Sequence, residues 1–263
     1  MRTILLDGDI VAYQIASRCE VSVDWGDDVV QRTTDMEEAK RQIDKHIRST
    51  IKMLGADRLI VCLTDSQNFR KDILPSYKAN RKVVIKPALL VEIRKYLHES
   101  QEVFQRPLLE ADDVMGILST MGDNKLITGE RIIVSIDKDM KSVPGKLFNP
   151  NKVALGVIEI SEEQADYEHM KQTLTGDATD GYSGCPGIGK GKVAACLTKK
   201  NPDDSLWDLV VRQFTKKGLT EDDALVQARV ARICRASDYD FLNKWPIPWS
   251  PPKRIPTQTN KAA

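Results

Sequence analysis

The sequence lacks the features of an exported or membrane-spanning protein. Its five cysteines are scattered and odd in number, and none forms a C-x-x-C pair. This argues against a disulfide framework and against a cysteine-based zinc site. No apolar run approaches the roughly 20 residues that cross a bilayer. The apolar start of the chain is interrupted by Asp7, too early for a signal peptide. We therefore expect a cytoplasmic protein without a membrane partner.

The sequence also has few histidines and almost no net charge. The three histidines lie far apart, and no Ser-His-Asp or Cys-His arrangement is visible. The net charge is +1, so bulk charge indicates no partner. Charge is instead concentrated between Phe69 and Lys95, where eight basic residues stand against two acidic ones. Such a segment favours a polyanionic partner, and a solvated charged face is the alternative.

Short apolar runs alternate with helical patterns along most of the chain. Residues 3–6, 58–63 and 131–136 have the composition of buried strands. An amphipathic helix is predicted from Met36 to Leu54, ending at Gly55, and another over 161–174. Shorter strands are predicted over 147–149 and 153–160. The alternation predicts an α/β protein with a parallel sheet flanked by helices.

Three predicted strands are followed by a carboxylate: Asp7, Asp65 and Asp137. Parallel strands bring their carboxyl ends together, so acids distant in sequence become neighbours. Residues two apart on an extended chain share a face, which places Asp9 beside Asp7 and Asp139 beside Asp137.

A further acidic stretch, Glu110-Ala111-Asp112-Asp113, opens a predicted helix. The helix dipole favours carboxylates there, but several at one place repel each other. A solvated helix start is the plain alternative. Together with Asp177 and Asp180, up to ten carboxylates would share one crevice and need at least two divalent cations, Mg²⁺ or Mn²⁺. Two such ions are the apparatus of phosphodiester hydrolysis.

Residues 175–192 are rich in glycine, with six in 18 positions. The run from Gly184 to Lys190 fits the first seven positions of a P-loop, but Gly191 stands where Ser or Thr would hold Mg²⁺. We therefore favour a glycine-rich hairpin between two helices, whose backbone N–H groups bind phosphate, over nucleotide hydrolysis.

These motifs, in this order, resemble the flap-endonuclease or 5′-nuclease family of PIN-like nucleases over about residues 3 to 200. The matching segments are Leu5–Gly8, Thr64-Asp65, Tyr77–Arg81, Glu110–Asp113, Asp137–Asp139, Thr175–Asp180 and the helix–three-turn–helix at Pro186–Gly189. Asp9 departs from the usual pattern, which has a small polar residue there. Asp7–Asp9, residues 180–184 and residues 231–235 are most similar to the 5′→3′ exonucleases of short-tailed phages.

The resemblance implies a role for each site residue. The first metal would be held by Asp7, Asp65, Glu110, Asp112 and Asp113, and the second by Asp137, Asp139, Asp177 and Asp180. Lys78 and Arg81 would act on the scissile phosphate as catalytic residues, with Tyr77 stacking on a base. DNA would also contact Lys82, Lys86, Gly187, Gly189, Lys190 and Lys192, with K⁺ at the hairpin.

The resemblance also implies an overall plan: a catalytic core over 1–160 with an arch at about 69–95, a helix–three-turn–helix module over 161–240, and a Pro-rich tail over 241–263. We expect a metal-dependent 5′→3′ exonuclease on duplex DNA that cuts 5′ flaps, removes RNA primers from RNA–DNA hybrids, and serves phage replication and recombination as a monomer in the host cytoplasm. The alternatives are a non-catalytic DNA-binding scaffold of the same fold and a PIN-type ribonuclease, although such ribonucleases are shorter and lack the hairpin.

Overall fold

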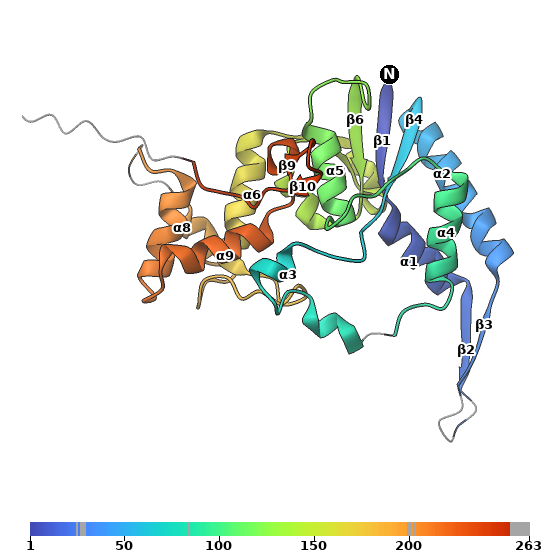
Figure 1. Ribbon diagram of the computed structural model, residues 1–263, viewed down its shortest axis with the longest axis horizontal. Coiled ribbons are helices and arrows are strands. Elements are labelled where there is room, and N and C mark those ends of the chain that lie inside the picture. Colours follow the sequence, from blue (N-terminus) through green and yellow to red (C-terminus); the bar gives the residue numbers. More distant parts are fainter. Residues whose placement is uncertain (25, 27–29, 84, 199–200, 202, 253–263) are drawn as a thin grey trace, which may run out of the picture.

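A computed structural model describes residues 1–24, 26, 30–83, 85–198, 201 and 203–252. Its centre is a six-stranded sheet with strand order β5-β4-β1-β6-β7-β8 (Figure 1). The first five strands of that order are parallel and β8 is antiparallel to β7. Their bounds are β1 Arg2–Asp7, β4 Arg58–Cys62, β5 Val103–Phe104, β6 Glu130–Val134, β7 Gly145–Phe148 and β8 Val157–Ile160. The predicted α/β class with a mostly parallel sheet is confirmed.

Alternate residues of the central strands face two separate cores. In β1, Ile4 and Leu6 join one core, whereas Leu5 joins the other. The first core is covered by α1 (Gly8–Arg18), α2 (Met36–Leu54) and α4 (Leu90–Ser100). The second is covered by α5 (Ala111–Thr120). Helices on both faces leave the carboxyl edge of the sheet as the place for a site.

Local chemistry explains where these elements begin and end. Helix α2 starts because Asp35 accepts a hydrogen bond from the N–H of Glu38, and it ends at Gly55 with φ +58°. The strand predicted over 153–160 is wrong in its first half. Asn149 caps a 3₁₀ helix, η3 (Pro150–Leu155), by accepting from the N–H of Asn151, so β8 begins only at Val157.

A second group of helices packs around a core of its own. It contains α6 (Glu162–Thr175), α7 (Val193–Cys196), α8 (Leu206–Thr215) and α9 (Glu221–Ala231). Trp207, Phe214 and Leu174 lie in that core. Figure 1 places α8 and α9 at the opposite end of the molecule from α2 and α4. The predicted start of α6 is confirmed, because Ser161 and Gln164 form a capping box.

Several shorter elements complete the chain. Strands β2 (Glu20–Asp24) and β3 (Val30–Thr34) form a hairpin that projects from the body (Figure 1), which the sequence did not predict. Two short helices, α3 (Arg70–Ile73) and the 3₁₀ helix η1 (Ala79–Val83), lie in the basic segment. The last short elements are η2 (Lys138–Ser142), η4 (Ala236–Asp238), β9 (Tyr239–Asp240) and β10 (Trp245–Pro246). Of the tail predicted over 241–263, residues 253–263 lie outside the described residues. In the described part, no helix is both long and apolar enough to span a membrane.

Candidate active site

The carboxyl ends of β1 and β6 bring Asp7 and Asp137 together. Asp7 is the last residue of β1 and caps α1, with its Oδ1 accepting from the N–H of Ile10 at 3.1 Å. Its Oδ2 accepts from the hydroxyl of Ser135 at 2.8 Å, and that hydroxyl accepts from the N–H of Asp137 at 3.0 Å. Ser135 is buried and was missed by sequence reasoning. The sequence feature that could have identified it is a single hydroxyl-bearing residue in an otherwise apolar strand.

Asp112, in the first turn of α5, completes a group of mutually repelling carboxylates with Asp7 and Asp137. Burial, with a contribution from the charge of Asp137, raises the pKa of Asp7 to about 6. Burial and then the charges of Asp7, Asp137 and Glu110 hold the pKa of Asp112 well above its usual value. Among the described residues, no basic side chain forms an ion pair with any of the three. We call Asp7, Asp112 and Asp137 the central carboxylates.

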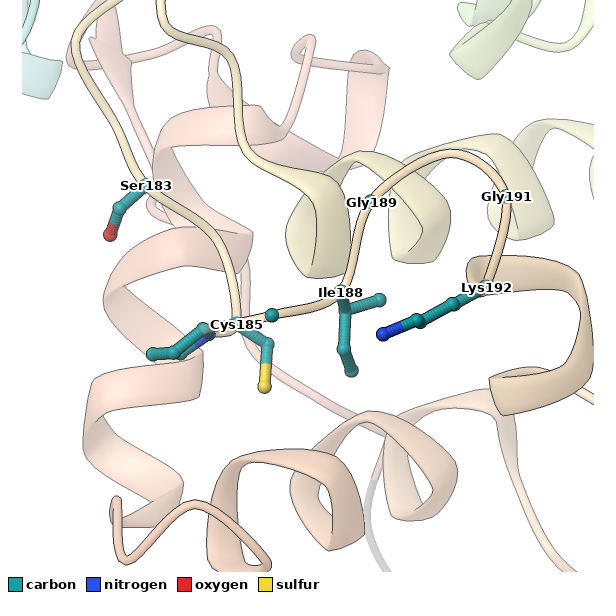
Figure 2. Close-up of a pocket in the computed structure, with 8 residues that line it drawn as sticks. Ser183, Cys185, Ile188, Gly189, Gly191 and Lys192 are labelled. Atoms are coloured by element: carbon teal, nitrogen blue, oxygen red, sulfur yellow. The ribbon is translucent and has the colours of Figure 1, made fainter.

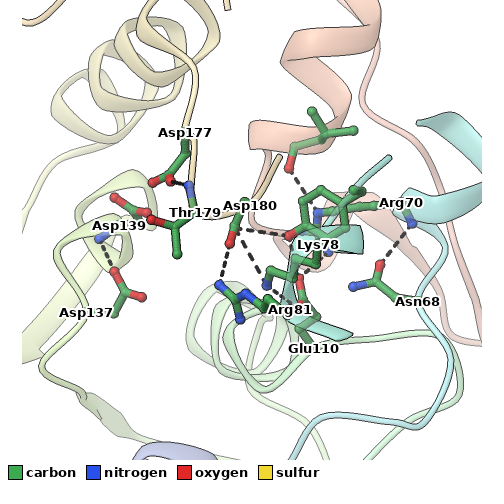
Figure 3. Close-up of polar contacts among 12 residues, drawn as sticks. Asn68, Arg70, Lys78, Arg81, Glu110, Asp137, Asp139, Asp177, Thr179 and Asp180 are labelled. Carbon is green, nitrogen blue, oxygen red and sulfur yellow. Dashed lines mark hydrogen bonds and ion pairs between the residues drawn. The ribbon is translucent and has the colours of Figure 1, made fainter. Parts of the chain in front are cut away.

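Asp139 and Asp177 form a second acidic group beside Asp137 (Figure 3). Asp137 Oδ1 accepts from the N–H of Asp139 at 2.7 Å, which starts η2. Lys138 lies between the other two, with Nζ 2.7 Å from Asp139 Oδ1 and 3.6 Å from Asp177 Oδ2. Burial raises the pKa of Asp139, and the neighbouring charge of Asp137 adds to that effect. Asp137 thus adjoins both acidic groups.

The basic segment folds onto two further acids, Glu110 and Asp180 (Figure 3). Lys78 Nζ contacts Glu110 and lies 3.6 Å from Asp180 Oδ2, and Arg81 Nη2 lies 2.5 Å from Asp180 Oδ1. The hydroxyl of Tyr77 donates to Glu110 Oε2 at 2.8 Å and to Asp180 Oδ2 at 3.3 Å. Burial alone would raise the pKa of Glu110, but Lys78 and Arg70 outweigh it and hold this pKa at about 2.

Asp113, unlike its neighbour Asp112, is turned away from the central carboxylates. It is fully buried, and both of its oxygens bind the guanidinium of Arg70, at 2.6 and 2.7 Å. It also accepts from the N–H groups of Cys234 at 2.9 Å and Glu110 at 3.0 Å. Every lone pair that a metal would use is therefore already engaged within the protein.

Asp65 and Asp9 are likewise occupied elsewhere. Asp65 accepts from the N–H groups of Leu108 at 3.1 Å and Gln67 at 3.3 Å, so it shapes the loop before α5. The expectation that Asp9 lies beside Asp7 on an extended chain is wrong, because α1 already begins at Gly8. From that helix Asp9 binds Arg94 and accepts from the N–H of Thr64 at 2.9 Å.

In the described chain, no three or more acidic, histidine or cysteine side chains stand close enough to form a finished metal site. The structure brings the carboxylates to one edge of the sheet without closing them into such a site. The donors are all carboxylate oxygens, the ligand type that suits Mg²⁺ and Mn²⁺.

The predicted DNA-contacting residues fall into three groups. Tyr77 is only 3 % exposed, so its ring is not presented for stacking on a base. Lys86 and Lys190 are exposed on the surface, and the side chain of Lys82 lies outside the described residues. Figure 2 shows the glycine-rich hairpin, where Gly187, Gly189 and Lys192 help to line an open hollow of about 490 Å³.

Buried side chains, among them Cys185 and Ile188, hold the hairpin in place. Ile188 is 8 % exposed and packs into the core of the second helix group. Gly187 has φ +75°, a conformation that favours glycine, so the backbone turns sharply over this anchor. The neighbouring N–H groups and lysines are thereby left at the surface.

An acidic site at the carboxyl edge of a parallel sheet, faced by a folded basic segment, defines a nuclease of the PIN-like class. Comparison with known proteins makes the assignment specific. Residues 2–172 match the family described as "5'-3' exonuclease, N-terminal resolvase-like domain". The chain belongs to this family of phage 5′-nucleases and is a 5′-3′ nuclease, a hydrolase.

Two phage proteins resemble the chain over nearly its whole length. The "Exonuclease" of Escherichia phage T7 is 33 % identical, covering 94 % of this chain and 93 % of that protein. The "Exodeoxyribonuclease" of Enterobacteria phage T3 is 32 % identical, covering 94 % and 92 %. Among solved structures, the bacteriophage T5 flap endonuclease in complex with DNA and metal ions shares the fold, with a TM-score of 0.59 at 15 % identity over 88 % of this chain and 89 % of that one.

Proposed function

We propose that the chain is a divalent-metal-dependent 5′→3′ exonuclease on duplex DNA that also cuts 5′ flaps and removes RNA from RNA–DNA hybrids. It would serve phage replication and recombination as a monomer in the host cytoplasm. The observation that carries the proposal is the group of three central carboxylates without a basic partner in the described chain. Repulsion of this kind is costly, and it is relieved when cations bind among the oxygens.

Two ion positions suit the acidic groups. The first would be held by Asp7, Asp112 and Asp137, with Glu110 adjoining it. The second would be held by Asp137, Asp139 and Asp177, so that Asp137 serves both. Two divalent cations bound in this way activate a water and neutralise the leaving oxygen of a phosphodiester. Asp113 is better assigned to the framework, because both of its oxygens pair with the buried Arg70 guanidinium. We assign Asp65 to the loop before α5, whose N–H groups it binds.

The chain's own cations then bind and orient the substrate. Lys78 and Arg81 face the acidic groups from the folded basic segment. A phosphate that binds between these two cations and the carboxylates would replace a carboxylate as their anionic partner, so little additional charge has to be buried. Tyr77 is assigned to hold Glu110 and Asp180 through its hydroxyl, in place of the stacking role expected from the sequence.

The glycine-rich hairpin is proposed to bind the duplex backbone. Gly187 and Gly189 let the main chain approach a phosphate closely, and Lys190 and Lys192 add charge. Contacts of this kind fix the position of the DNA without reading its sequence. A K⁺ ion coordinated by carbonyl groups of the hairpin would strengthen them. Lys86 would extend the basic surface along the single strand or flap.

The relatives support this assignment in graded ways. The printed names of the T7 and T3 proteins specify exonuclease and exodeoxyribonuclease activity, at an identity that shows the family. The T5 structures contain metal ions and DNA, and they share only the fold with this chain. Their contents are consistent with the ions and substrate proposed for the acidic edge.

A substrate panel tests the function. The purified protein is incubated with 5′-labelled linear duplex, closed circle, flapped duplex and an RNA–DNA hybrid, with Mg²⁺ or with EDTA. We expect nucleotide release from the linear duplex, cleavage at the flap junction and digestion of the RNA strand, all requiring Mg²⁺. The closed circle should survive. Lack of cleavage with Mg²⁺ would contradict the proposed nuclease activity, and cleavage of the closed circle would contradict the requirement for a DNA end. Light scattering during gel filtration tests whether the protein is a monomer.

A further inference from the structure

A small cavity lies beside α5 and the edge strand β5, with Phe104 of β5 in its lining. Its volume is about 90 Å³, and Leu109, Val114 and Ile117 form part of its wall. This is far below the roughly 300–1,000 Å³ of sites that enclose a small-molecule ligand. It is several times the 10–15 Å³ that admits one water. The cavity therefore has room for one apolar side chain.

One polar group in this wall has no partner. Tyr239 lines the cavity and is 6 % exposed, yet its hydroxyl makes no hydrogen bond to any described residue. The ring is held edge-to-face against Phe241, with 5.2 Å between centroids. A buried hydroxyl without a partner is costly, and most such groups in proteins are satisfied. In the described structure this buried hydroxyl therefore lacks an acceptor.

The charged residues that line the cavity are both basic. The guanidinium of Arg106 lies 3.6 Å from the ring centroid of Phe104, and Lys244 is exposed on the turn between β9 and β10. The nearby Asp240 is used within that turn, where it accepts from the N–H groups of Leu242 and Asn243. A ligand with an apolar end and carboxylates beside it complements this surface in both shape and charge.

The surface around the opening is apolar as well. Phe241, Leu242 and Trp245 are 48 %, 88 % and 57 % exposed. Exposed apolar side chains gathered beside a cavity mark interaction sites more often than isolated ones do. The group lies on the β9–β10 segment, which Figure 1 shows next to α5.

We propose that this surface binds an acidic peptide segment of a partner protein. One apolar side chain of the segment enters the cavity, an acceptor meets the Tyr239 hydroxyl, and carboxylates pair with Arg106 and Lys244. A nucleobase fits less well, because its edge carries several hydrogen-bonding groups and the cavity offers one unpaired hydroxyl. Leu109 directly precedes Glu110, so the segment would dock on the reverse side of the turn that carries the active site.

The probe is a fluorescein-labelled peptide of four aspartates followed by a C-terminal leucine, titrated with full-length protein and followed by anisotropy. We expect saturable binding below about 1 mM, the weak range of transient contacts. Arg106→Glu and Lys244→Glu should each weaken binding at least roughly tenfold, by reversing one charge pair. Lys52→Glu, the same charge change on the exposed side of α2, is the matched control and should leave binding within about twofold.

Tyr239→Phe separates a ligand contact from a packing role. Loss of one hydrogen bond should weaken the peptide roughly 3- to 10-fold, while the melting temperature stays the same or rises, because an unpaired hydroxyl is removed. Unchanged affinity in this variant would contradict the proposed contact. Replacement of the peptide's leucine by serine should abolish binding, and equal binding would overturn the role of the cavity.

Two further outcomes would overturn the proposal as a whole. One is the absence of saturable binding of the peptide. The other is displacement of the peptide by a single-stranded oligonucleotide of equal charge, at equal affinity and with the same dependence on Arg106 and Lys244, which would assign the surface to nucleic acid. Neither outcome would affect cleavage in the substrate panel, so the proposed nuclease function is tested separately.

Discussion

Two sets of carboxylates lie within a few residues of each other, and they differ in how their charge is compensated. Arg70 forms an ion pair with Asp113, and Arg94 forms one with Asp9. The central carboxylates, by contrast, have no ion pair in the described chain, and the pKa values of Asp7 and Asp112 are raised. Asp113 and Asp9 stabilise the framework through their ion pairs, whereas the central carboxylates repel each other and favour an incoming cation.

The contrast is sharpest between Asp112 and Asp113, which are adjacent in sequence. Successive helix residues point about 100° apart, so the first turn of α5 presents one to the acidic edge and the other to the interior. Arg70, which binds Asp113, also donates to the backbone carbonyls of Val230 and Arg232. One buried arginine therefore joins the basic segment, the start of α5 and the end of α9.

The largest expected effect comes from Asp112→Asn. Loss of one central carboxylate should lower the cleavage rate of flapped DNA by roughly a thousandfold, equivalent to about 4 kcal/mol of barrier. Binding of the same DNA in Ca²⁺ should stay within about threefold, because phosphate contacts elsewhere supply most affinity. Single-turnover kinetics and anisotropy measure the two quantities. A parallel loss of rate and binding would remove Asp112 from the catalytic set.

Asp113→Asn, one residue further, should act on stability. It leaves the buried Arg70 guanidinium with only the more distant Glu110, at 3.3 Å, as a partner charge, which costs about 3 kcal/mol of unfolding free energy. Urea denaturation of both variants provides the comparison, and Asp112→Asn should not be destabilised in the same experiment. A loss below about 1 kcal/mol for Asp113→Asn would show that the pair is dispensable to the framework.

Asp7→Asn should stabilise the protein when divalent ions are removed by EDTA. The folded-state pKa of Asp7 is raised to about 6, so its ionisation destabilises the fold as pH rises through that value. A pKa shift of about two units corresponds to about 2–3 kcal/mol of unfolding free energy at pH 7.5. Asparagine removes the charge and still caps the helix. The gain should vanish near pH 4, where the folded wild-type carboxyl is protonated. Equal stability at pH 7.5 would contradict the repulsion.

Asp9→Asn should have the smallest effect. Asp9 is about one-quarter exposed and pairs with Arg94, so its loss should cost about 1 kcal/mol of stability. The cleavage rate should remain within about threefold of the wild type. If the rate fell by the factor expected for Asp112→Asn, Asp9 would belong with the central carboxylates after all.

The sequence was sufficient for the fold class and for the edge of the sheet that carries the acids. Strands of four to six buried residues are distinctive, and parallel pairing brings the residues after each strand to one edge. The capping residue of α6 was also predictable, because Ser161 acts on a neighbour three residues away, whereas α2 is capped by Asp35, one residue after the cap expected at Thr34. In η3, the local effect of Asn149 was stronger than the β propensity of the residues after it.

The roles of individual acids were less predictable, because they depend on distant partners. Asp113 is fixed by Arg70 and by the N–H of Cys234, which lies 121 residues away in sequence. Tyr77 could be placed in the basic segment, but its burial results from contacts with Tyr182 and Val230. Spacing identifies candidate ligands, whereas tertiary contacts decide which of them remain uncompensated.

The central claim is that Asp137 is common to two metal positions, one formed with Asp7 and Asp112 and the other with Asp139 and Asp177. Titration of chelator-treated protein with Mn²⁺, followed by electron paramagnetic resonance of the free ion, tests it most directly. The account predicts two bound ions for the wild type and for Asp9→Asn, and at least a tenfold loss of affinity at both positions for Asp137→Asn. Unchanged Mn²⁺ binding by Asp137→Asn, or no binding by the wild type, would contradict it.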